Sequence, residues 1–245
     1  MSIIRHIIIL LVAMVVCAVG ATAAVNSARA VLGKPDLEAI RAATTDEHSR
    51  YYYPTLLRAF LRNDTVMSDT EYQYFYYGTL FQEEFDPYRK PYNPEQLEAL
   101  SPLFSKEKLT RAERQSILDY SMQAVENDPV NLRQINNRIF AYEQRGDVNL
   151  ARIWQNKLNH LLLVIASSGS GVDRDNAWIV VSPQHEYDFL NLKGIKATNH
   201  RFEPPYYDYI EVEHADKQHA GYFFEIKELL NQYFLKHPSE LQNPQ

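Results

Sequence analysis

The stretch VNLARIWQNKLNHLLLVIASSGSGVDRDNAWIVVS, residues 148–182, decides the fold class. Its first part, Val148 to Ala166, has the composition and apolar spacing of a helix. Its last part, Ala177 to Ser182, is a short run of β-branched and aromatic residues, which predicts a strand. The segment Ser167 to Gly171 between them predicts a flexible joint. The chain therefore changes from helices to strands at this point.

Upstream of the joint the sequence predicts helices alone. Two capping boxes, Ser68–Glu71 and Thr110–Glu113, mark helix starts because the hydroxyl oxygen accepts the N3 amide while the glutamate reaches back. Three prolines between Pro87 and Pro94 exclude a continuous helix and predict a linker at residues 85–94. The predicted helices lie at residues 35–43, 55–62, 69–81, in a short segment from 94, after Thr110, and at 131–145 and 148–166.

After the joint at residues 167–171, most of the predicted elements are strands. Aromatic and β-branched runs predict strands at residues 177–182, 206–213 and 222–226, with a weaker one at 195–202 and helices at 183–192 and 226–235. Helices precede strands instead of alternating with them, which argues against a doubly wound parallel sheet. We therefore predict an α+β fold: a helical region at 35–166, then a C-terminal region at 172–236 with a small, mainly antiparallel sheet and a closing helix, and a polar tail at 237–245.

One helical hairpin, at about residues 111–166, has tetratricopeptide (TPR) spacing. Small residues let the two helices approach closely, and a glycine permits the turn between them. The spacing is carried by Ala124, Pro129, Tyr142, Gly146 and Ala151. Arg138 stands where a small or apolar residue is usual. Because stable solenoids need about three or more repeats, we predict a TPR-like hairpin and no array.

The N-terminus has the three parts of a secretory signal. Arg5 precedes an apolar run from Ile7 to Val19, and small residues follow it. We predict a signal peptide at residues 1–23, with cleavage after Ala23 and Ala30 as the second choice. An uncleaved membrane anchor is the alternative, since the apolar run is nearly long enough to span a bilayer. After cleavage we expect no membrane association, and a periplasmic or secreted location.

Composition limits the classes of function. The only cysteine, Cys17, lies in the predicted leader, so disulfides and thiol chemistry are not expected in the mature chain. Lys and Arg total 25 against 31 Asp and Glu, and no basic stripe is visible. Nucleic acid is therefore excluded as a partner. The sequence does not predict an oligomeric state.

Two tyrosine-rich segments, Tyr51–Arg58 and Thr70–Gln82, resemble the domain of unknown function 4919 family. The loop Ser167–Gly171 with the strand after it, and the segment His185–Leu190, are also similar. The resemblance extends from about residue 35 to residue 230. It implies an exported protein of Bacteroides-type bacteria, and the family offers no catalytic residues to transfer.

The aromatic residues of these segments are the candidate binding surface. Tyrosine offers a rigid apolar face with a polar tip, which suits sugar rings or a peptide partner. The alternative is that these rings form the core between helices, because the 69–81 helix carries aromatic residues on more than one face. The candidate residues are Tyr51, Tyr52, Tyr53, Tyr72, Tyr76, Tyr77, Phe81 and Tyr88.

The spacing of the candidate metal and phosphate ligands does not match that of known binding motifs. His185-Glu186 begins like a zincin motif, but Phe189 occupies the position of the second histidine. The loop Ser168–Gly171 is followed by a strand, whereas a phosphate loop needs a helix there. A further acidic and histidine group predicts a solvated turn; it comprises Glu211, Glu213, His214, Asp216 and His219. We therefore predict no metal site and no cofactor.

No catalytic motif is present either, because there is no Gly-x-Ser-x-Gly elbow and no cysteine beyond the leader. We predict a non-catalytic binding or scaffold protein of the bacterial cell envelope that holds a protein or glycan partner. The alternative is an envelope hydrolase with an unrecognised site in the histidine- and carboxylate-bearing C-terminal third.

Overall fold

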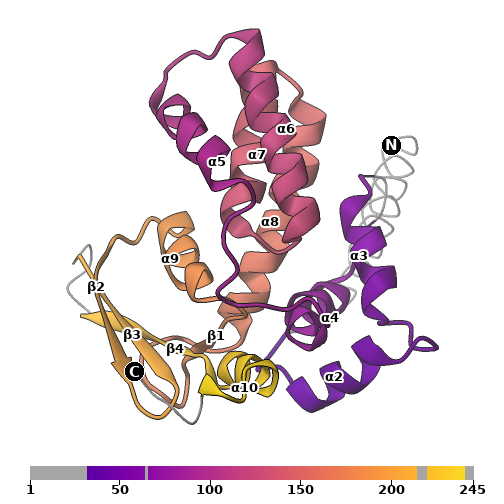
Figure 1. Ribbon diagram of the computed structural model, residues 1–245, viewed down its shortest axis with the longest axis vertical. Helices are drawn as coiled ribbons and strands as arrows, with labels where there is room; N and C mark the ends of the chain where they lie inside the picture. Colours follow the sequence, from indigo (N-terminus) through magenta and orange to yellow (C-terminus); the bar gives the residue numbers. More distant parts are fainter. Residues whose placement is uncertain (1–31, 64–65, 214–219, 241–245) are drawn as a thin grey trace, which may run out of the picture. The chain divides into compact units, whose positions relative to one another are not determined.

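The computed structural model describes residues 32–63, 66–213 and 220–240, and within them helices come first and a small sheet follows (Figure 1). The predicted leader lies outside the described residues. The helices before the sheet are α2 (Leu37–Thr45), α3 (Tyr53–Leu61), α4 (Asp69–Gly78), α5 (Pro94–Leu100), α6 (Arg111–Asn127), α7 (Leu132–Arg145) and α8 (Val148–Ser167), with short 3-10 turns η1 (Thr79–Phe81) and η2 (Ser101–Ser105). The predicted helical region is confirmed.

Local sequence signals set the helix starts as expected. Both capping boxes form, with Ser68 and Glu71 at the start of α4 and Thr110 and Glu113 at the start of α6. The proline-rich linker stays irregular until Pro94 begins α5. These starts depend on residues within one turn of the helix, which is why the sequence alone predicts them.

The last three helices before the sheet pack as successive neighbours, α6 on α7 and α7 on α8. Gly146 ends α7 with a φ of 83°, the left-handed turn that favours glycine. The buried Arg138 guanidinium lies 3.8 Å from the centre of the Trp154 ring. A large cation fills the position where a TPR pair carries a small residue, and the assignment of the hairpin as TPR-like is not confirmed.

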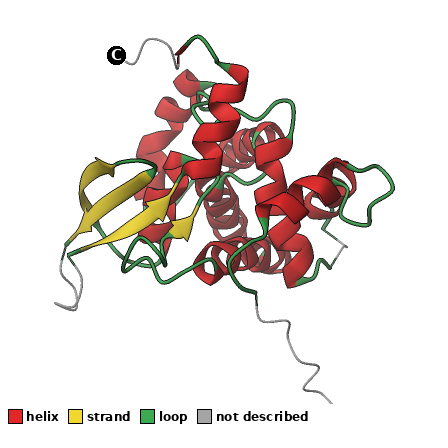
Figure 2. Cartoon of the chain, turned by 90° about the horizontal axis from the view of Figure 1, so that it is seen from below, coloured by secondary structure: helices red, strands yellow, loops and turns green. Residues whose placement is uncertain are grey.

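The sheet is small and mixed, with strand order β1-β4-β3-β2. Strands β2 (Ala197–Glu203), β3 (Tyr207–Val212) and β4 (Gly221–Glu225) pair antiparallel, while β1 (Trp178–Ile179) runs parallel to β4. Helix α9 (Pro183–Leu192) follows β1, α10 (Lys227–Lys236) closes the chain, and the strands lie together beside the helices (Figure 2). The weaker predicted strand at 195–202 forms as β2, whereas the predicted strand at 177–182 pairs only at Trp178 and Ile179.

The joint between helices and sheet is tightly bonded, which corrects the prediction of flexibility. The amides of Ser170 and Gly171 both donate to the carbonyl oxygen of Asn176, at 2.9 and 2.7 Å. Gly171 has a φ of 74°, and a Cβ on it would lie 2.7 Å from the Trp178 ring. Glycine is required here for close packing as well as for its backbone conformation.

The helical region and the sheet region belong to one unit of structure that starts at Leu32. Helix α4 contacts α2, α3 and α8, so its aromatic residues are packed on more than one side. Helix α9 contacts α7 on one side and β2 on the other. No helix in the described ranges is long and apolar enough to cross a bilayer.

Candidate functional site

A cleft of about 560 Å³ lies where the proline-rich linker, the turn between α6 and α7, and the start of α9 meet. The segments 84–92, 126–131 and 181–185 line it, and the side chains of Tyr53 and Tyr120 contribute as well. Three segments distant in the sequence therefore build one concave site, and we refer to it as the central cleft.

The eight predicted tyrosine and phenylalanine positions do not form one surface. Rings at Tyr53, Tyr72, Tyr76 and Tyr77 are buried, so at these four positions the structure agrees with the core interpretation. The half-buried positions are Tyr51, Tyr52 and Phe81, and Tyr88 is 52% exposed. Of the eight, Tyr53 and Tyr88 line the central cleft.

His185 is a buried polar group of the cleft wall. Its Nδ1 lies 2.9 Å from the hydroxyl of Tyr76, which also accepts a hydrogen bond from the amide of Val181 at 3.4 Å. A hydroxyl oxygen carries two lone pairs as well as its proton, so the contact with Tyr76 allows either ring nitrogen of neutral His185 to carry the proton. Burial lowers the pKa of His185 to about 3. The ring stays neutral near pH 7 and can donate a hydrogen bond, but it is a weak base.

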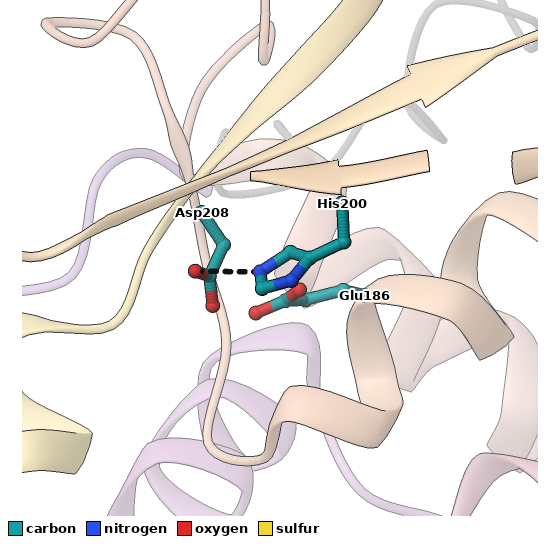
Figure 3. Close-up of side chains that lie close together, drawn as sticks. All are labelled: Glu186, His200 and Asp208. Carbon is teal, nitrogen blue, oxygen red and sulfur yellow. Dashed lines mark hydrogen bonds and ion pairs between the residues drawn. The ribbon is translucent and has the colours of Figure 1, made fainter. Parts of the chain in front are cut away.

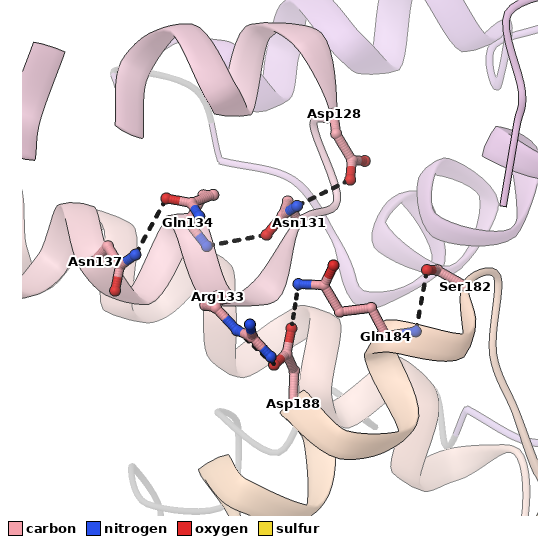
Figure 4. A network of polar contacts seen from close by, with 8 residues as sticks. All are labelled: Asp128, Asn131, Arg133, Gln134, Asn137, Ser182, Gln184 and Asp188. Carbon is pink, nitrogen blue, oxygen red and sulfur yellow. Dashed lines mark hydrogen bonds and ion pairs between the residues drawn. The ribbon is translucent and has the colours of Figure 1, made fainter. Parts of the chain in front are cut away.

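A chain of polar contacts ties α9 to the α6–α7 turn beside the cleft (Figure 4). Arg133, at the start of α7, donates to Oδ1 of the buried Asp188 at 3.0 and 2.7 Å, and Gln184 donates to its Oδ2 at 3.0 Å. Asn131 caps α7 and donates to Asp128 at 3.1 Å. Both sides of the cleft are thus held in place by hydrogen bonds between side chains.

The electrostatics of the cleft combine a carboxyl group with neutral donors. Burial raises the pKa of Asp128, while Asn131 and Arg89 act in the opposite direction. Burial likewise raises the pKa of Tyr53 to about 12, so its hydroxyl remains protonated and pairs with Thr79 at 3.3 Å. Arg89 donates to the backbone carbonyls of Glu84 and Asn127. The cleft therefore offers donors, an acceptor and aromatic faces.

The acidic group predicted to be a solvated turn is only partly described. Glu211 accepts from Asn199 at 3.4 Å and from Arg201 at 3.3 Å, and Glu213 pairs with Lys196 at 3.2 Å. His214, Asp216 and His219 lie outside the described residues. Glu211 and Glu213 thus contact side chains of β2 and of the residue before it.

Sequence reasoning missed most of the cleft. The sequence singles out neither Asp128 nor the linker at 85–94 as chemically distinctive, because each lies in a proline or turn pattern with no chemistry of its own. Gln184 and Arg133 lie 51 residues apart in sequence and meet only through Asp188. The one usable signal was Tyr88, an aromatic residue inside a polar, proline-rich linker.

A family model described as "Domain of unknown function (DUF4919)" matches residues 38–234. No curated protein and no solved structure matches the chain.

Proposed function

We propose a function from the central cleft, because this chain belongs to the family described as Domain of unknown function (DUF4919) and that description names no activity. The proposed function is that of a non-catalytic binding protein of the bacterial cell envelope that holds a carbohydrate. The observation that carries the proposal is the central cleft itself, where aromatic rings and hydrogen-bonding side chains face one volume of about 560 Å³. Sites for small ligands typically occupy about 300–1,000 Å³.

The aromatic lining supports a sugar as the ligand. Phe85, Tyr88, Tyr92 and Tyr120 all border the cleft, and Tyr88 is half exposed with its ring edge-on to Tyr233 at 4.9 Å. A tyrosine ring gives an apolar face for the C–H side of a pyranose and a hydroxyl for its polar edge. An exposed ring at the mouth of a cleft loses little conformational entropy on binding, because it has only two side-chain torsions.

The polar lining supports the same ligand. Sugar hydroxyls both donate and accept, so they fit sites that place donors and acceptors side by side. Gln184 and Arg133 offer donors, Asp128 offers an acceptor, and His185 offers an imidazole ring. The Arg133–Asp188 pair joins α7 to α9, the helices that carry Arg133, Gln184 and His185. A fixed, mixed donor and acceptor set favours a neutral polar ligand over a charged one.

The test is a glycan array probed with the purified chain, followed by calorimetric titration of the best ligand. Tyr88→Ala should weaken binding at least tenfold, or about 1.4 kcal/mol, because it removes the exposed aromatic face. Tyr74→Ala is the matched control, since Tyr74 stacks on Tyr51 at 4.1 Å outside the cleft lining. Silence on the array, binding of peptides alone, or equal affinity in Tyr88→Ala would overturn the proposal.

A hydrolase is the second candidate, and the observation that favours it is His185 in the wall of the cleft. Against it, His185 is bonded to a tyrosine and not to an orienting carboxylate, and burial lowers its pKa to about 3. A general base works best when its pKa lies near the working pH. If the parent chain hydrolyses a bound glycan and His185→Gln does not, the hydrolase is favoured. If the parent chain binds the glycan without hydrolysing it, the binding protein is favoured.

Export is part of the proposal and rests on the signal pattern of residues 1–23. Cell fractionation with N-terminal sequencing tests it. We expect the chain in the envelope or medium fraction, beginning at Ala24. An intact chain in the cytosol that still carries Met1 would refute export and leave the cleft to be tested by itself.

A further inference from the structure

A second polar site lies apart from the cleft lining, between α9 and the sheet (Figure 3). Glu186 comes from α9, His200 from β2 and Asp208 from β3. In the β2–β3 ladder, His200 pairs with Ile210 and Phe202 with Asp208, so His200 and Asp208 are diagonal neighbours on one face. Glu186 lies beside them, and the three side chains converge from three elements.

The geometry is that of a ligand set. Nε2 of His200 lies 2.8 Å from Oδ1 of Asp208. One ligand atom from each of Glu186, His200 and Asp208 lies within 4.8 Å of the others. Metal–ligand distances for nitrogen and oxygen are about 2.0–2.2 Å, so small shifts of these side chains would bring all three donors onto one ion placed among them.

The burial of the two carboxyl groups is the independent observation. Glu186 is 1% exposed and Asp208 is 5% exposed. Oε1 of Glu186 is buried and has no hydrogen-bond partner among the described residues. Leaving a buried polar oxygen unpartnered costs about 1–3 kcal/mol, so such atoms call for an explanation. A bound cation would supply the missing partner of this oxygen.

The two neighbouring carboxyl groups also need a positively charged partner. The ligand atoms of Glu186 and Asp208 lie within 4.8 Å of each other, and two carboxylates so close together repel unless a proton or a cation lies between them. Among the described residues, the imidazole of His200, when protonated, is the cation that pairs with Asp208.

We propose that Glu186, His200 and Asp208 bind one divalent transition-metal ion of the zinc class. One imidazole nitrogen and two carboxylate oxygens suit zinc or manganese, whereas magnesium and calcium prefer oxygen ligands alone. Three protein ligands leave a fourth position of a zinc ion for water. The side chain of His200 is 43% exposed and borders a surface hollow of about 390 Å³, which gives the ion a route from solvent.

The test is calorimetric titration of Zn²⁺, Mn²⁺, Mg²⁺ and Ca²⁺, each alone, into the purified, metal-stripped full chain without an affinity tag. We expect one equivalent of Zn²⁺ to bind, and Mg²⁺ and Ca²⁺ to give no signal. Glu186→Gln and His200→Ala should each weaken zinc binding at least a hundredfold, because each removes a ligand. His200→Ala changes a partly exposed side chain, so it keeps the test valid if Glu186→Gln does not fold.

Two control variants separate this site from adventitious binding. His48→Ala removes an exposed histidine and Glu213→Gln an exposed carboxylate of the same sheet region. Both should bind zinc as the parent chain does. The proposal is overturned if the parent chain binds no zinc, if Ca²⁺ binds and Zn²⁺ does not, or if His48→Ala loses as much affinity as His200→Ala.

Discussion

The α7–α8 helix pair buries two cations, Arg138 and Lys157, whereas the contact between α9 and the sheet buries two carboxyl groups, Glu186 and Asp208. The cations lie over the ring of Trp154, at 3.8 and 4.2 Å from its centre. Both regions bring like charges together away from water, which is costly unless each charge finds partners. The comparison shows which partners each region supplies.

The two buried cations have hydrogen-bond acceptors within the protein. Lys157 donates to the carbonyl oxygens of Phe60 and of Arg62 (2.8 Å for the latter), at the end of α3, where helix carbonyls lack partners. Arg138 donates to the hydroxyl of Tyr142 at 3.3 and 3.2 Å. The carboxyl pair differs, because Oε1 of Glu186 has no partner among the described residues. Buried charge alone therefore indicates architecture, and an unpartnered buried charge indicates a site.

The largest expected effect is on the cation region. Trp154→Ala removes the ring over which both cations lie and should lower the free energy of unfolding by about 3–5 kcal/mol. Val148→Ala, a change at an exposed position of the same helix, should alter it by less than about 0.5 kcal/mol. Urea denaturation monitored by circular dichroism measures both. A decrease of less than about 1 kcal/mol in the free energy of unfolding of Trp154→Ala would show that this region is not part of the hydrophobic core.

A smaller effect concerns pH. Burial, and secondly Arg138, lowers the pKa of Lys157 to about 8 from its usual 10.5. Between these values the unfolded chain binds more protons, so stability rises with pH, and below pH 8 this group contributes no slope. From pH 7.5 to 9.5 the parent chain should gain about 2 kcal/mol relative to Lys157→Met. If the free energy of unfolding changed with pH in the same way in both chains, Lys157 would not be desolvated in the folded state.

The smallest effect is expected at the carboxyl pair in the absence of metal. Glu186→Gln keeps the shape of the side chain and removes its ability to carry a negative charge. With a chelator present, its free energy of unfolding should lie within about 1 kcal/mol of the parent value. Zinc should then raise the melting temperature of the parent chain and leave that of Glu186→Gln unchanged. A zinc response retained in Glu186→Gln would place the ion elsewhere.

Much of the fold could be predicted from local sequence. The capping boxes at Ser68 and Thr110, Gly146 after α7, and the change of pattern at Ser167 each depend on neighbours in the chain. Strand β2 gave a weak signal because its residues are exposed or half-buried, without the alternation of a half-buried strand. Val180 and Val181, predicted as strand, are buried but take no part in the strand pairing of β1, since burial of an apolar run does not specify its hydrogen-bond partners.

The sites could not be predicted in the same way. Helix periodicity shows that Tyr76 is on an apolar face, but not that its hydroxyl meets His185 in α9. Asp208 resembles an outward-facing strand residue until α9 covers that face. His200 and Asp208 become neighbours through the register of β2 and β3, and the Pro204-Pro205 pair between the strands marks a turn without specifying that register. Chemistry here depends on contacts between distant segments.

The difference between the two regions is tested most directly by nitrogen-15 NMR of the imidazole rings, before and after one equivalent of Zn²⁺, with His200→Ala to assign the signals. The ring signals of His200 should shift, while those of His160, stacked on Tyr72, and of His185, bonded to Tyr76, should not. Unchanged His200 signals in a chain that has bound zinc, or shifted signals at His160 or His185, would contradict the account.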